Sequence, residues 1–325
     1  MLENKESLEN APVAVFVYNR LEHTKRLIES LKKNKEATDS DLYIFSDAPK
    51  ETGDEERRKL AALKVADVRD YIESIDGFKR VTIVKREMNY GLAKNITAGI
   101  TEVLATHPTV IVLEDDLIVS EALLYYMNSA LNKYADSENV YSISGYSFIK
   151  KNENTGEVND TYFLPMTCSW GWATWRDKWE CYDAKAKGWE ILKSDKKEKE
   201  KFNFGNSIDY YSMLKAQMEK GIDSWAIRWY WSVYQRSGLT LYPSLSYIAN
   251  GGFDGSGVHT IGETPGGKRL ELSDSANITF PKDYHIDSNI CGAVQNSIMG
   301  IEHNTIKDQI NRIIKKNMIK LGISL

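Results

Sequence analysis

The chain has 325 residues, an apolar content of 42% and a formal net charge of −4. This length suits one large α/β domain with an appendage, and the near-balanced charge gives no sign of a nucleic-acid partner. The three cysteines, Cys168, Cys181 and Cys291, lack the spacing of a metal site, so we expect reduced thiols in a cytoplasmic protein. The leader is polar, which predicts no signal peptide, and no apolar run reaches the ~20 residues of a membrane span.

Short apolar runs alternate with amphipathic stretches along the first half of the chain. The runs predict strands at 13–18, 42–45, 81–84, 110–113 and 140–144, with helices after the first strand (starting near His23) and at 54–75, 91–104 and 120–134. In the helix at 54–75 we expect an inner face made of Leu60, Leu63, Val65, Val68 and Ile72. This β-α alternation predicts a mostly parallel, right-handed sheet in three layers.

Three consecutive acids, Glu114-Asp115-Asp116, follow the strand at 110–113. In open α/β sheets, ligands bind at the C-terminal edge of the strands. Because three adjacent carboxylates repel one another, we expect a cation there, and Mg²⁺ or Mn²⁺ prefers oxygen ligands of this kind. The alternative is a solvated acidic turn that caps the next helix.

Other strands also end in polar residues. Arg20 offers a fork of donors suited to a diphosphate, although a surface salt bridge is the alternative. Asp47 could accept hydrogen bonds from a ribose or a base edge, or it could be an Asx-turn residue. The turn Asn89-Tyr90-Gly91 opens a helix whose N-terminus, together with Lys94, could meet an anion; a plain loop is equally compatible.

All eight tryptophans lie between Trp170 and Trp231. Gly171 separates two of them, which suggests close approach of a ligand or another segment. We expect Trp170 and Trp172 to offer faces on which a sugar ring can stack, whereas Trp175 and Trp179 have the spacing of inward-packing helix residues.

Two later residues are candidates for chemistry. Asp223 precedes an aromatic helix, where partial desolvation would raise its pKa and suit it to act as a general base; the alternative is an N-cap. His259 ends a glycine-rich loop and could be a metal ligand. The tail at 300–325 reads as an amphipathic helix that docks on the body, binds a partner, or makes peripheral contact with the inner face of an anionic membrane.

Taken together, four motifs resemble GT-A-fold nucleotide-sugar glycosyltransferases. They are the V-x-V-Y-N-R strand, the S-D turn, the N-x-G-L-A-x-N helix start and the strand ending in E-D-D. The order is similar to bacterial family 2 enzymes that build surface polysaccharides, and to the Golgi N-acetylglucosaminyltransferase I family. The resemblance covers about Val13 to His259.

The resemblance implies an α/β GT-A fold with a C-terminal helical appendage, and an inverting, metal-dependent transfer from a UDP-sugar to a saccharide or lipid-linked saccharide. Asp116 and His259 would bind Mn²⁺ or Mg²⁺, Asp115 the ribose with Glu114 beside it, Asp47 the uracil and Arg20 the phosphates. Asp223 would be the catalytic base, unless the catalytic position is the one that Ser224 occupies here. Trp170 and Trp172 would bind the acceptor. The full donor-binding set is Tyr18, Arg20, Asp47, Asn89, Lys94, Glu114 and Asp115.

The expected organisation is a disordered leader at 1–11, a catalytic domain at 12–260 and an extension at 261–325. Within the domain, residues 12–119 form the nucleotide-binding half and 120–260 the acceptor half. Two other functions stay open at this point. A nucleotidyltransferase should have a glycine-rich loop after its first strand, and Asn19-Arg20-Leu21-Glu22 contains no glycine. A non-catalytic glycan-binding protein would use the tryptophans but would not need the acid triplet.

Overall fold

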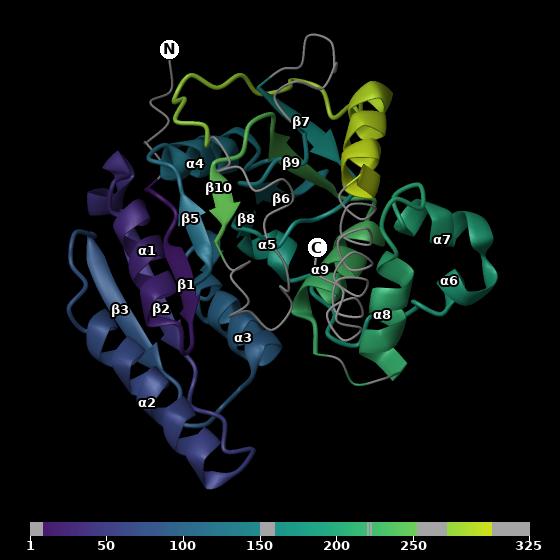
Figure 1. The fold of residues 1–325 in the computed structure, drawn as a ribbon. Coiled ribbons are helices and arrows are strands. Elements are labelled where there is room, and N and C mark those ends of the chain that lie inside the picture. Colours follow the sequence, from purple (N-terminus) through teal and green to yellow (C-terminus); the bar gives the residue numbers. More distant parts are fainter. Residues whose placement is uncertain (1–8, 150–159, 220, 222, 252–271, 301–325) are drawn as a thin grey trace, which may run out of the picture.

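The computed structural model describes residues 9–149, 160–219, 221, 223–251 and 272–300. Eight strands of this part form one sheet in the order β3-β2-β1-β4-β8-β6-β9-β7 (Figure 1). Only β8 and β7 run antiparallel to the other six strands. The mostly parallel sheet predicted from the sequence is therefore confirmed.

The first half of the chain follows the predicted β-α alternation, with ends that differ by only a few residues. Its elements are β1 (Val13–Val17), α1 (Leu21–Leu31), the 3₁₀ helix η1 (Lys35–Asp39), β2 (Asp41–Ser46), α2 (Glu55–Ile72), β3 (Arg80–Lys85), α3 (Leu92–Leu104) and β4 (Thr109–Glu114).

The second half adds strands to the far side of β4 and a group of helices beside them. Its elements are β5 (Leu117–Val119), α4 (Leu123–Lys133), β6 (Val140–Ser144), β7 (Thr161–Leu164), β8 (Trp172–Trp175), α5 (Arg176–Trp179), α6 (Ile191–Ser194), α7 (Lys196–Phe202), α8 (Tyr210–Glu219), α9 (Trp225–Tyr234), β9 (Leu239–Pro243) and β10 (Ile248–Asn250). Residues 288–300 are also helical.

The central strands are buried on both faces, which gives the predicted three layers. In β1, Val13, Val15 and Val17 pack into one core with α1, α2 and α4. Ala14 and Phe16, which alternate with them, pack into a second core with α3 and α9. This alternation follows from the two-residue period of a strand, and burial of both faces explains the almost uninterrupted apolar runs.

A third core joins α6–α9 and β7 and β9 to the helix at 288–300. That helix contributes Ile290, Val294 and Ile298. This helix, which the sequence analysis did not identify, therefore packs on the body of the protein through these residues. The amphipathic face expected at 301–325 lies outside the described residues. Within the described part of the chain, no helix is long and apolar enough to cross a bilayer.

Three details of the prediction were wrong. The helix α1 begins at Leu21, two residues before the predicted start. Leu60 and Leu63 are 53% and 63% exposed, because at 100° per residue Leu63 lies opposite the buried face of α2 and Leu60 lies to the side of it. The helix expected from residue 120 starts at Leu123, because the residues after the acid triplet form β5, which pairs with β10 in a separate two-stranded sheet.

Candidate active site

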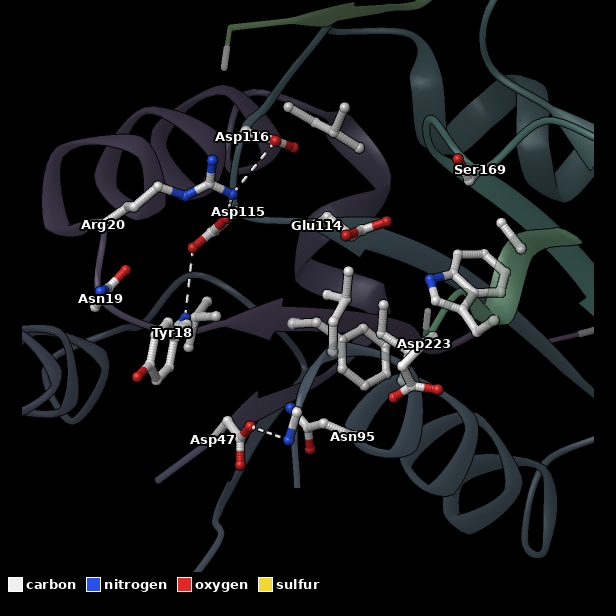
Figure 2. A pocket seen from close by; sticks show the side chains of 18 of the residues that line it. Tyr18, Asn19, Arg20, Asp47, Asn95, Glu114, Asp115, Asp116, Ser169 and Asp223 are labelled. Atoms are coloured by element: carbon white, nitrogen blue, oxygen red, sulfur yellow. Dashed lines mark hydrogen bonds and ion pairs between the residues drawn. The ribbon is translucent and has the colours of Figure 1, made fainter. Parts of the chain in front are cut away.

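A cavity of about 350 Å³ opens at the C-terminal ends of β1, β2 and β4. Most of the residues selected from the sequence line it, and they come from both halves of the chain (Figure 2). The lining residues among them are Tyr18, Arg20, Asp47, Asn89, Glu114, Asp115, Asp116, Trp170 and Asp223.

Arg20 and the last two acids of the triplet form one ion-pair group. The Nη2 atom of Arg20 contacts Oδ1 of Asp115 and lies 3.3 Å from Oδ2 of Asp116. The side chains of Arg20, Asp115 and Asp116 are 19%, 5% and 18% exposed, respectively, so water screens these charges weakly. Although burial opposes ionisation, the two carboxylates raise the pKa of Arg20 above its ordinary value.

The pairing of β1 with β4 brings this group together. Phe16 lies beside Glu114 in the parallel register, and the amide of Asp115 donates to the carbonyl of Phe16 at 3.1 Å. Oδ2 of Asp115 then accepts from the amide of Tyr18 at 3.4 Å. Because α1 begins immediately afterwards, Arg20 occupies the N-cap position beside the acids.

Glu114 differs in protonation from an ordinary surface glutamate. Burial, with the nearby charges of Asp116 and Asp115, raises its pKa to about 8, while Arg20 acts in the opposite direction. Burial also raises the pKa of Asp115 despite its contact with Arg20. A raised pKa favours the protonated form of Glu114, in which the carboxyl group can donate a hydrogen bond.

The described residues fit a divalent metal only in part. They contain no group of three or more histidine, cysteine, aspartate or glutamate side chains arranged around one metal position. Asp116 does offer one carboxylate to the cavity, and Mg²⁺ commonly takes one or two protein carboxylates with the remaining oxygens from water and substrate phosphates. The site thus fits a metal that shares its coordination sphere with a phosphate ligand. His259 lies outside the described residues.

The carboxylate of Asp47 already accepts hydrogen bonds from donors of the chain itself. Its side chain accepts from the amides of Ala48, Tyr90 and Gly91 at 2.9, 2.8 and 2.9 Å, and from Nδ2 of Asn89 at 3.2 Å. The residue is 5% exposed. In this structure Asp47 therefore holds the Asn89–Gly91 turn against the end of β2.

Two arginines that do not line the cavity, Arg69 and Arg86, hold the loops that follow β2 and β3. Arg69 of α2 donates to the carbonyl oxygens of Asp47 and Arg86 at 3.3 and 2.8 Å. The Arg86 guanidinium lies over the rings of Phe45 and Tyr90 and donates to Oδ1 of Asn95 at 3.0 Å. These contacts fix the wall of the cavity before any ligand binds.

The two tryptophans on either side of Gly171 have different environments. Trp170 lines the cavity and meets the ring of Tyr146 edge to face at 4.7 Å. Trp172 is fully buried in β8 and stacks on Trp225 at 5.4 Å, so the expectation that it binds an acceptor is wrong. Gly171 has a φ of +61°, and a Cβ there would lie 1.9 Å from Cδ1 of Ile248. Trp175 and Trp179 are buried, as expected, but they do not share a helix, because Trp175 ends β8 and only Trp179 lies in α5.

Asp223 faces the cavity from the side opposite Arg20 (Figure 2). Its side chain is 56% exposed and pairs with Nη2 of Arg228 at 2.8 Å. The desolvation expected beside the indole rings is therefore absent. Asp223 is also not the N-cap of α9, because Ser224 occupies that position.

Lys94 is the remaining predicted donor residue, and it does not line the cavity. Its Nζ atom lies 4.0 Å from the centroid of the Tyr90 ring. Sequence reasoning in turn missed several lining residues: Asn19, Lys50, Asn95, Ser169 and Asn250. Asn19 and Asn95 belong to motifs that were recognised, so their place in those motifs could have identified them. Asn250 could be found only from the pairing of β10 with β5.

Comparisons with known proteins agree with this architecture. Residues 13–164 match the family described as Glycosyl transferase family 2. No curated protein sequence matches the chain.

Several solved structures are similar at low sequence identity. The mannosyltransferase PcManGT from Pyrobaculum calidifontis, in complex with GDP-Man and Mn²⁺, is 14% identical over 52% of this chain and 45% of its own, with a TM-score of 0.36. TarS residues 1–349 from S. aureus are 13% identical over 74% and 59%, with a TM-score of 0.41. The S. aureus TarS structure is 14% identical over 74% of this chain and 36% of its own, with a TM-score of 0.41. The chain thus spans between 36% and 59% of the chains it matches.

The resemblance inferred from the sequence is confirmed for residues 13–164, which are similar to Glycosyl transferase family 2.

Proposed function

We propose that this protein transfers a sugar from a nucleoside-diphosphate donor to a hydroxyl of a saccharide or lipid-linked saccharide in surface polysaccharide synthesis. The single observation that carries the proposal is the cavity itself: Arg20, Asp115 and Asp116 line it together with Trp170, and Asp223 faces it from the side opposite Arg20 (Figure 2). A donor with a charged diphosphate and an acceptor with a sugar ring need two such different sides.

The diphosphate belongs beside Arg20, because a guanidinium offers several N–H donors in a geometry that matches phosphate oxygens. The uncapped N-terminus of α1 adds backbone N–H groups at the same place. Asp116 would hold Mn²⁺ or Mg²⁺ there. When bound, the metal would neutralise charge that develops on the leaving diphosphate.

The nucleoside belongs in the part of the cavity between Tyr18 and Asn89. UDP is the donor we favour, from the resemblance to family 2 enzymes. Since Asp47 already accepts four hydrogen bonds, we propose that it shapes the wall that contacts the base. The Nδ2 atom of Asn89 is directed at Asp47 and Ala48, so the rest of the Asn89 amide group is available to the base.

The acceptor belongs on the side of Trp170, whose ring can stack on a sugar. Asp223 takes the proton from the acceptor hydroxyl as that oxygen attacks the anomeric carbon from the face opposite the leaving group, which predicts inversion of configuration. Arg228 directs the carboxylate of Asp223, because its guanidinium donates to Oδ1 at 2.8 Å.

A screen of UDP- and GDP-sugars for Mn²⁺-dependent release of the nucleoside diphosphate tests the proposal. We expect release from at least one donor, stimulation by an oligosaccharide acceptor, and loss of both with Asp116→Asn. Formation of a nucleotide sugar from a nucleoside triphosphate and a sugar 1-phosphate would instead identify a nucleotidyltransferase. Glycan binding without any nucleotide binding would identify a lectin.

A further inference from the structure

One nitrogen atom, Nη2 of Arg20, contacts both Asp115 and Asp116. The two carboxylates that are expected to bind a metal cation are therefore already paired with a cationic side chain, the guanidinium of Arg20. The three side chains are at most 19% exposed, so their charges interact across a poorly screened region.

This arrangement makes the site unfavourable for a free divalent ion. A cation bound to Asp116 would lie close to the guanidinium, and like charges in a weakly screened region repel strongly. It would also compete with Arg20 for Oδ2 of Asp116, which lies 3.3 Å from Nη2.

A diphosphate changes this balance. Its oxygens can accept hydrogen bonds from Arg20 and also bind the metal, so its negative charge lies between the two cations and attracts both. The guanidinium has five N–H donors, so it can contact a phosphate while it keeps its contact with the buried Asp115.

We propose that Arg20 is a selectivity residue: it makes Asp116 accept a divalent cation together with a diphosphate and disfavours the free ion. This inference rests on the proposed function and adds to it an internal counter-ion that couples the binding of metal and nucleotide. Because the coupling between two ligands is reciprocal, UDP should raise the affinity for Mn²⁺ by the same factor by which Mn²⁺ raises the affinity for UDP.

The test measures Mn²⁺ affinity by electron paramagnetic resonance of the free ion, and UDP affinity by calorimetry, each ligand alone and both together. Arg20→Met should bind Mn²⁺ alone about tenfold more tightly than the wild type and UDP alone about tenfold less tightly. Arg20→Lys keeps the positive charge and should keep the weak Mn²⁺ binding. Arg26→Met, at an exposed position of α1 whose Nε bonds only the carbonyl of Glu22 among the contacts described, is the matched control and should leave both affinities unchanged.

A general loss of structure would weaken both ligands together, so only opposite changes for Mn²⁺ and UDP support the proposal. If Arg20→Met is poorly folded, the double variant Arg20→Met/Asp115→Asn removes the unpaired buried charge and keeps Asp116, and the same tighter Mn²⁺ binding is expected. Unchanged or weaker Mn²⁺ binding by the folded variants would overturn the proposal. The proposed function fails separately, if the wild type binds neither UDP nor UDP with Mn²⁺ and releases no nucleotide from any donor.

Discussion

The amide of Gly251 donates a 2.7 Å hydrogen bond to the carbonyl oxygen of Asp116. This bond extends the pairing of β10 with β5, and a Cβ at position 251 would lie 3.4 Å from the same oxygen. The backbone of Asp116, the last acid of the triplet, is therefore held by the residue that follows β10. The site belongs to both halves, and the predicted division near residue 119 passes through it.

The base assignment predicts a specific kinetic defect. Asp223→Asn should lower kcat by about 10²–10⁴-fold, because the amide cannot take a proton, and should leave UDP affinity unchanged. Ser224→Ala is the neighbouring control and should retain activity. Full turnover in Asp223→Asn, or the larger loss in Ser224→Ala, would exclude Asp223 as the base. Initial rates with a saturating donor, together with calorimetry of UDP, distinguish these results.

Asp47 should matter for stability as well as for donor binding. Asp47→Asn removes one of the two oxygens that accept from the amides of Tyr90 and Gly91, and we expect the free energy of unfolding to fall by about 1–3 kcal/mol. Urea denaturation measures this change, with Asp39→Asn at an exposed position as the control. A higher KM for the donor at unchanged stability would show instead that Asp47 contacts the base directly.

Gly171 and Ile248 should behave as a coupled pair. Gly171→Ala introduces a Cβ 1.9 Å from Cδ1 of Ile248 and places alanine at a φ of +61°, a conformation that costs roughly 1–2 kcal/mol before any clash. Ile248→Val removes the clashing methyl group and alone should cost about 0.5–1.5 kcal/mol. The double variant should be more stable than the sum of the single effects, and strict additivity in a double-mutant cycle would contradict this packing.

Glu114 predicts a pH dependence of stability. Its pKa is about 8 in the folded, metal-free protein and near its ordinary 4.5 when unfolded, so the folded state binds the extra proton between these values. The stabilisation is fully present below about pH 4.5 and is lost as pH rises through about 8, with a slope of at most ~1.4 kcal/mol per pH unit.

Urea unfolding in the presence of a chelator, at pH 5 and pH 8, measures this dependence. Glu114→Gln should lose less stability than the wild type between the two pH values, because its amide does not ionise. Asp115, whose pKa is also raised, leaves part of the decline in the variant. An identical decline in both proteins would place the titrating group elsewhere.

Much of the fold was predictable because it depends on local patterns. β1 is apolar throughout, and β2 and β4 are apolar between their first and last residues, as expected for strands buried on both faces. The polar residues at their C-terminal ends must meet at one edge when the strands are parallel. Arg20, Asp47 and the acid triplet could therefore be assigned to a single region before their contacts were known.

The partners of these side chains depend on contacts between segments that are distant in sequence. The sequence does not distinguish Trp170 from Trp172. In the folded chain, the left-handed turn at Gly171, packed on Ile248, places Trp170 at the cavity and Trp172 in the core. The carboxylate of Asp47 could serve a ligand or a turn, and only the folded chain shows that it accepts hydrogen bonds from the amides of Tyr90 and Gly91. Sequence periodicity determines which residues are buried and which reach an edge. The atoms that they meet there depend on how the finished sheet, its helices and β10 pack together, because those contacts form only when all of these elements are in place.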